Sequence, residues 1–100
     1  MSDASSLRVV VYQEDEQWIA QCVDYDIGAQ GTSFDDMSVK FALTLRADFE
    51  ESMSRHGEAF SGIDPAPAHF EKMWESRPAD VQSVRPTDGG MPTFDMALVA

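Results

Sequence analysis

Four aspartates in the first half of the sequence are the side chains most suited to metal chemistry. Asp24 and Asp26 are separated by one residue, and Asp35 and Asp36 follow a short stretch later. A two-metal nuclease site requires several carboxylates that converge from strand interiors and a helix. We expect these acids to lie instead in a turn and at a helix cap, where solvation and capping account for them. The sequence therefore predicts no metal site, and no other cofactor is expected.

His56, His69 and Cys22 are the other candidates for metal binding or nucleophilic chemistry. No ligand spacing recurs among them, so a zinc site would require a coincidence of folding. His56 lies near the expected end of a helix, where it interacts favourably with the helix dipole. Cys22 lies in a predicted strand and is typical of a small buried hydrophobic residue. The serines show no nucleophile elbow, and the sequence predicts a protein without enzymatic activity.

The charge balance favours a protein partner over nucleic acid. Eighteen Asp and Glu against seven Lys and Arg give a formal net charge of -11. A field of that sign repels a phosphate backbone, so we expect no direct nucleic-acid binding. A basic protein is the natural complement, because opposite charge speeds encounter. The alternative is that the acidic surface only keeps the protein soluble.

Length and composition indicate one domain over residues 1–100. The 100 residues are 43% hydrophobic, which suits a single globular core. No apolar run approaches the roughly 20 residues of a membrane span. Residues 1–6 form a polar N-terminal tail without the pattern of a signal peptide. A single cysteine fits a reducing compartment, so we expect a cytoplasmic protein that does not enter the membrane.

Alternating apolar residues predict an α+β fold with an antiparallel sheet. Strands at about 7–13 and 18–23 are joined by a short acidic turn, which makes them a hairpin. A short strand at about 29–32 follows a second turn. Residues 93–99 alternate again, and we place them as a fourth strand beside the first. Residues 78–92, rich in proline and glycine, are predicted to be an irregular loop.

A long amphipathic helix is predicted at about residues 34–55. Its apolar residues recur every four positions and comprise Met37, Phe41, Leu45, Phe49 and Met53. Ser33 and Asp36 resemble a capping box, and Gly57 suits the C-terminal stop. We expect this helix to pack across the sheet. Gly31, just before it, and Gly28 are expected to permit special backbone angles or a close approach.

Val39 and Leu43 form a second apolar strip on the opposite flank of this helix. Such a strip on an otherwise charged helix requires a cover. A second short helix is predicted at about residues 66–76, after Asp64-Pro65, and it carries Phe70, Met73 and Trp74. We favour this second helix as the cover. The alternative is another subunit or a protein partner.

The order of these features resembles the HicB-like antitoxin domain over Leu7 to Phe49. That family shows a strand, an acidic turn, an aromatic residue opening the second strand, a glycine-bearing loop, a short strand ending in Gly-x-Thr or a close variant, and a helix. The matching segments here are Val9-Val10-Val11-Tyr12, Glu14-Asp15-Glu16, Trp18-Ile19-Ala20, Asp24-Tyr25-Asp26-Ile27-Gly28 and Gly31-Thr32-Ser33-Phe34-Asp35-Asp36. The proline common before the family's loop glycine is absent. The residues after Gly57 contain no basic recognition helix, so the DNA-binding segment usual in such antitoxins is not expected.

The resemblance implies a partial ribonuclease-H-like fold and a non-catalytic protein-binding function. In the family this domain binds a small basic ribonuclease toxin, and it also self-associates. The residues expected at the partner interface are Glu14, Asp15, Glu16, Asp24, Asp26, Val39 and Leu43. The alternative function is a structural or regulatory homo-oligomer, expected as a dimer, with no toxin partner. The apolar strip and an open strand edge would then serve self-association.

Overall fold

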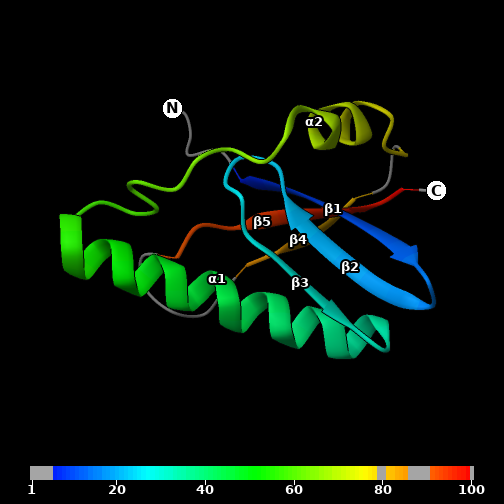
Figure 1. Ribbon diagram of the computed structural model, residues 1–100, viewed down its shortest axis with the longest axis horizontal. Helices are drawn as coiled ribbons and strands as arrows, with labels where there is room; N and C mark the ends of the chain where they lie inside the picture. Colours follow the sequence, from blue (N-terminus) through cyan, green and yellow to red (C-terminus); the bar gives the residue numbers. More distant parts are fainter. Residues whose placement is uncertain (1–5, 79–80, 86–90, 100) are drawn as a thin grey trace.

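A five-stranded mixed sheet with one helix on each face forms the molecule (Figure 1). The computed structural model describes residues 6–78, 81–85 and 91–99. The elements in chain order are β1 (Leu7–Glu14), β2 (Gln17–Cys22), β3 (Gly28–Gly31), α1 (Phe34–His56), α2 (Ala68–Glu75), β4 (Gln82–Val84) and β5 (Phe94–Leu98). The predicted α+β class, with a long main helix and a short second one, is confirmed.

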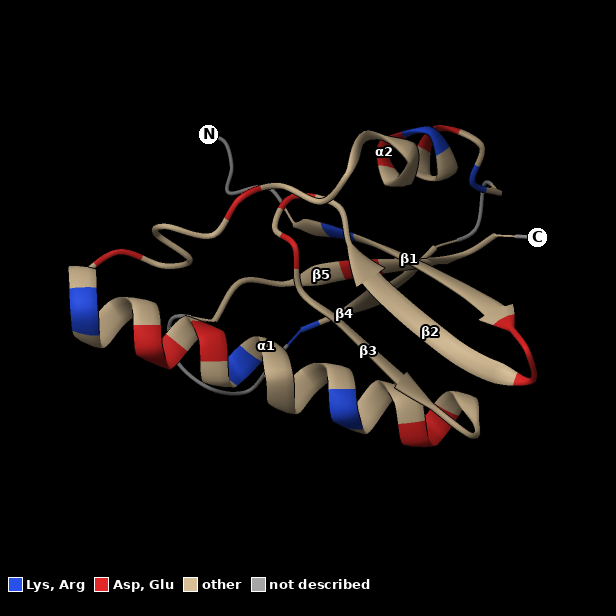
Figure 2. Cartoon of the chain, in the orientation of Figure 1, with Lys and Arg blue, Asp and Glu red and all other residues tan. Residues whose placement is uncertain are grey.

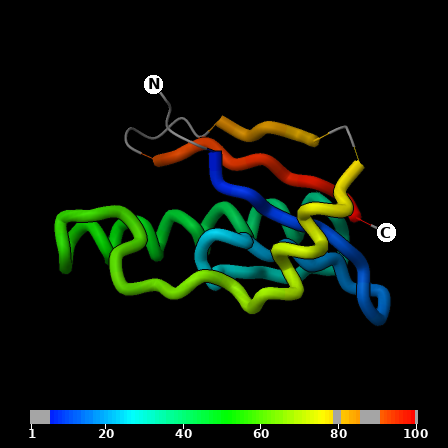
Figure 3. Tube along the Cα trace, turned by 90° about the horizontal axis from the view of Figure 1, so that it is seen from above, coloured from blue at the N-terminus to red at the C-terminus, as the bar shows by residue number. Residues whose placement is uncertain are grey.

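The strand order is β3-β2-β1-β5-β4, and Figure 3 shows β4, β5 and β1 side by side. The hairpin of β1 and β2 is antiparallel, with Val11 opposite Ala20. The fourth predicted strand, here β5, does lie beside β1, but it runs parallel to it, with Val9 opposite Met96. The expectation of a purely antiparallel sheet was therefore wrong. Alternation of apolar residues reports which face is buried and carries no information on strand direction.

Part of the predicted loop at 78–92 is a strand. β4 pairs antiparallel with β5, and Ser83 lies opposite Asp95. Gln82 and Ser83 are exposed and polar, so this short edge strand has no apolar alternation that would predict it. The rest of that prediction falls partly on residues 79–80 and 86–90, which lie outside the described residues, as do residues 1–5 of the predicted tail.

The helix α1 covers one face of the sheet with the predicted apolar stripe. Met37, Phe41 and Leu45 are fully buried, whereas Met53 is 41% exposed toward the far end of the helix. The predicted N-cap is confirmed, because Ser33 Oγ accepts a hydrogen bond from the Asp36 backbone N–H at 3.0 Å, and the Asp36 side chain accepts the backbone N–H of Thr32 at 3.0 Å. Gly57 ends the helix with a φ of 70°, a left-handed conformation that glycine adopts without strain.

A close backbone approach joins β3 to α1 at Gly31. A Cβ atom on Gly31 would lie 2.6 Å from the backbone nitrogen of Met37, a separation that no side chain tolerates. The predicted close approach is thus confirmed at this glycine. It lets α1 pack most closely on β3 and β2.

The helix α2 covers the opposite face of the sheet, so it does not cover the strip of Val39 and Leu43. Trp74 packs in a separate core with Val10 of β1 and Ala97 of β5. The expectation that this helix covers the strip was wrong, because β1 is apolar on both faces and its second face needs α2. Among the described residues, no helix is both long enough and apolar enough to cross a membrane.

Candidate protein-binding surfaces

The residues predicted at a partner interface fall into three separate places. Glu14, Asp15 and Glu16 form the tip of the first hairpin, and the turn of Asp24 and Asp26 lies at the other end of β2. β2 has six residues, which separates these two ends by roughly 20 Å. The strip of Val39 and Leu43 on α1 is a third surface. The fold therefore does not gather the predicted residues into one site.

The hairpin tip is an exposed acidic projection. Glu14, Asp15 and Glu16 are all exposed, and Figure 2 shows the acidic colour at this bend. Asp15 and Glu16 have φ values of 51° and 66°. Positive φ at both central residues is what a type I′ hairpin turn requires, and this turn usually contains Asn-Gly or Gly-Gly. The tip thus presents its carboxylates on a tight and conformationally strained turn.

Asp24 is bonded within the chain. Its Oδ2 accepts the backbone N–H of Arg8 at 2.8 Å, and its Oδ1 accepts Arg8 Nε at 3.0 Å and Nη2 at 2.8 Å. Arg8 Nη1 also donates to Oε2 of Glu71 on α2 at 2.6 Å. These hydrogen bonds, with Asp24 contributing most, raise the pKa of Arg8. Asp24 therefore joins β1, the turn and α2, which leaves its carboxylate little freedom to meet a partner.

Asp26, by contrast, is exposed at the edge of the same turn. Its backbone N–H donates to the carbonyl of Asp64 at 2.7 Å, and its Oδ1 accepts Gln21 Nε2 at 3.1 Å. The first contact places two acids from distant segments next to each other in space. Asp64 was not among the predicted interface residues, because only the fold brings its segment back to this turn.

A polar hollow that sequence reasoning missed lies between the end of α1 and the turn after it. It has a volume of about 210 Å³ and is lined by Asp48, Glu51, Ser52, Arg55, His56, Ser61, Gly62 and Ile63. Burial, and then the neighbouring Glu51, raise the pKa of Asp48. The spacing of Asp48, Glu51, Ser52 and Arg55 on one helical face was the signal available in the sequence. No group of three His, Cys, Asp or Glu side chains in the described ranges is arranged to hold a metal ion.

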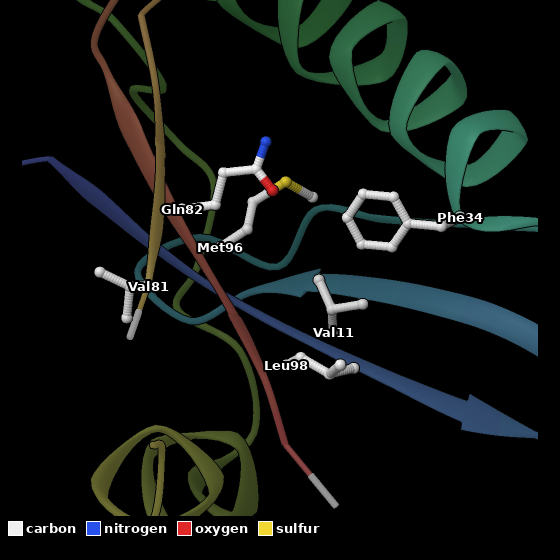
Figure 4. Close-up of a pocket in the computed structure, with 6 residues that line it drawn as sticks. All are labelled: Val11, Phe34, Val81, Gln82, Met96 and Leu98. Carbon is white, nitrogen blue, oxygen red and sulfur yellow. The ribbon is translucent and has the colours of Figure 1, made fainter. Parts of the chain in front are cut away.

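Two apolar cavities, also missed, lie beside α1 where it packs on the strands β4 and β5. One cavity of about 270 Å³ is lined by Val11, Phe34, Val81, Gln82, Met96 and Leu98. Figure 4 shows Phe34 reaching from the first turn of α1 across the gap toward Met96. A second cavity of about 190 Å³ on the same side of α1 includes Leu43, Arg46, Val84 and Phe94. Both cavities are smaller than the roughly 300–1,000 Å³ of typical small-molecule pockets.

The remaining candidates for chemistry do not meet. Cys22 is buried, and burial raises the pKa of its thiol, as expected for a core residue. His56 is exposed at the end of α1, and the ring of His69 lies 4.0 Å from that of Phe70 on α2. Comparisons with known protein families, with curated proteins and with solved structures give no significant match.

Proposed function

We propose that the chain is a non-catalytic protein-binding domain of the HicB-like antitoxin type, which neutralises a small basic ribonuclease toxin in the cytoplasm. The observation that carries this proposal is the pair of exposed acidic surfaces, Glu14 to Glu16 and Asp26 with Asp64, on a chain with a net charge of -11. The order of motifs from Leu7 to Phe49, which resembles that family, supports it.

Inhibition on this proposal is steric and electrostatic. The carboxylates of Glu14, Asp15 and Glu16, or that of Asp26 at the other end of β2, would occupy the basic groove with which the toxin binds RNA, which speeds encounter and blocks the substrate. Asp24 serves this surface indirectly, since its bonds to Arg8 hold the turn on which Asp26 lies.

The test is copurification of the chain from its native host at low and high salt, followed by a ribonuclease assay of any small basic partner. The expected result is a stoichiometric complex whose ribonuclease activity appears only when the chain is removed. Neutralising Glu14, Asp15, Glu16 and Asp26 as Gln or Asn should weaken binding at least tenfold, whereas the control Glu58→Gln, an exposed acid elsewhere, should not. Recovery without a small basic protein at any salt concentration contradicts the proposal.

A second candidate function is a structural or regulatory homo-oligomer without a toxin. The observation that favours it is the exposure of Val39 and Leu43, at 60% and 63%, because large apolar side chains together on a helix usually mark an interface. A neighbouring reading frame for a small basic protein favours the antitoxin, and its absence favours this second function.

A further inference from the structure

The outer flank of α1 carries an apolar strip that no other described helix or strand covers, between charges of opposite sign. Leu43, at one edge of the strip, also lines the cavity beside Val84 and Phe94. Val39 and Leu43 are exposed, and both described core clusters lie elsewhere, on the two faces of the sheet. In Figure 1, β1, β2, β5 and α2 all lie on one side of α1. Asp36 precedes the strip by three residues, and Arg46 follows it by three residues. Positions 36, 39, 43 and 46 are therefore symmetric about position 41, with an acid at the first and a base at the last.

This symmetry is what a twofold contact between two copies of the helix requires. When two identical helices cross antiparallel level with position 41, Val39 of one copy faces Leu43 of the other, and Asp36 faces Arg46. Both contacts then occur twice. Ala42 and Ala47, which are small and exposed, flank the strip and allow the helices to approach closely.

We propose that a second copy of this chain covers the strip, with the two α1 helices crossing antiparallel about a twofold axis through the outer face level with position 41. This interface does not depend on a toxin, and it defines the contact of the homo-oligomer considered above.

The charges beside the strip favour a second copy over a basic partner. Lys40 lies 3.1 Å from Asp36, and Arg46 lies 3.0 Å from Glu50. Each base is thus paired with an acid of the same helix, so the surface beside the strip is locally neutral and does not attract a basic protein. In the twofold arrangement, Asp36 of each copy lies level with Arg46 of the other, whereas Lys40 and Glu50 lie level with the uncharged Ala42 and Thr32. We therefore expect a basic partner to bind the acidic hairpin tip or turn, and a second copy of the chain to bind the strip.

The size of the contact predicts a weak dimer. A crossing of two helices over about four turns buries less than the roughly 800 Å² per partner of a standard interface. We therefore expect a dissociation constant in the micromolar range. Dimer and monomer should both be visible within the concentrations that purified protein reaches.

Sedimentation equilibrium of the purified chain tests the interface. The wild type should show a concentration-dependent dimer, Leu43→Glu should be monomeric throughout, and Arg46→Glu should weaken the dimer at least tenfold. Two matched controls lie on the same helix. Arg55→Glu makes the same charge change at a residue that also pairs with an acid, Glu51, and Met53→Glu makes the same change as Leu43→Glu at an exposed apolar residue. Both controls should dimerise as the wild type does.

Cysteine cross-linking tests the direction of the helices. Chains with Val39→Cys mixed with chains with Leu43→Cys should form the mixed disulfide faster than either chain alone, and Cys22 is buried and should not interfere. Circular dichroism of every variant checks that the fold is retained. A monomer at all concentrations, a dimer that survives Leu43→Glu, or faster cross-linking of Val39→Cys with itself overturns the proposal. No toxin takes part in these measurements, so failure of the antitoxin function leaves their outcome unchanged.

Discussion

Arg8 and Asp24 are joined through both the side chain and the backbone of the arginine. The guanidinium donates from Nε and Nη2 to one carboxylate oxygen of Asp24, and the Arg8 backbone N–H donates to the other at 2.8 Å. Asp26, two residues later, makes one side-chain hydrogen bond, to Gln21 at 3.1 Å. The two aspartates of this turn therefore have different roles. Asp24 stabilises the fold, and Asp26 faces the solvent.

This division predicts different costs for the same substitution. Asp24→Asn should lower the free energy of unfolding by about 1–2 kcal/mol, because charge-assisted hydrogen bonds are lost at a site where partial exposure screens them. Asp26→Asn, the matched control, should change it by less than about 0.5 kcal/mol. Urea denaturation followed by tryptophan fluorescence measures both. Equal effects of the two substitutions would show that Asp24 has no special structural role.

The strained hairpin turn predicts a stabilising substitution. Glu16 has a φ of 66°, a conformation that costs a residue with a Cβ roughly 1–2 kcal/mol. Glu16→Gly removes that cost but gives the unfolded chain more freedom, so the net gain should be about 0.5–1 kcal/mol. Thermal unfolding by circular dichroism measures it as a higher midpoint temperature.

The control for this prediction is Glu16→Ala, which removes the same charge and keeps the Cβ. It should leave the stability within about 0.5 kcal/mol of the wild type. A gain with alanine equal to that with glycine would mean that acidic repulsion at the tip, and not the backbone conformation, destabilises the turn.

The parts of the fold that the sequence predicts are those in which one face is apolar and the other polar. The spacing of apolar residues along the sequence is enough to predict the hairpin of β1 and β2 and the buried stripe of α1. The place of α2 does not, because β1 buries both Val9 and Val10 and therefore needs a helix on each face. The parallel pairing of β5 depends on the path of the chain through α2, and no local pattern encodes it.

The candidate surfaces were predictable to the extent that exposure follows from residue type. The acids of the hairpin tip are exposed as expected. The structural role of Asp24 could not be foreseen, since its partner Arg8 lies 16 residues away in sequence, and Glu71, the other acid that Arg8 binds, lies 63 residues from Arg8. The hollow beside Asp48 likewise forms only when the chain after α1 folds back on the helix (Figure 3).

Ser52 should be essential to the packing of that returning chain. It is a buried serine within α1, where its Oγ accepts the backbone N–H of Phe60 at 2.7 Å and donates to the carbonyl of Asp48 at 2.9 Å. Ser52→Ala leaves the buried N–H of Phe60 without its acceptor and should destabilise the protein by about 1–3 kcal/mol. Ser54→Ala, on the exposed side of the same helix, should be neutral or stabilising by up to about 0.5 kcal/mol. Chemical denaturation measures the free energy of unfolding of both variants. An unchanged value for Ser52→Ala would refute this role.

Asp48 should make the stability depend on pH. Burial, and then the neighbouring Glu51, raise its pKa in the folded state, so the folded chain holds this proton more tightly than the unfolded chain does. Stability is therefore lost as the pH rises from the unfolded pKa through the folded one, and the cost is complete at neutral pH. Asp48→Asn removes the charge, so it should be more stable than the wild type at pH 7, and the difference should vanish once the pH falls below the unfolded pKa. Denaturation curves across the acidic range measure this difference against Glu58→Gln, and a gain that stays constant with pH would show that the carboxylate of Asp48 is not its source.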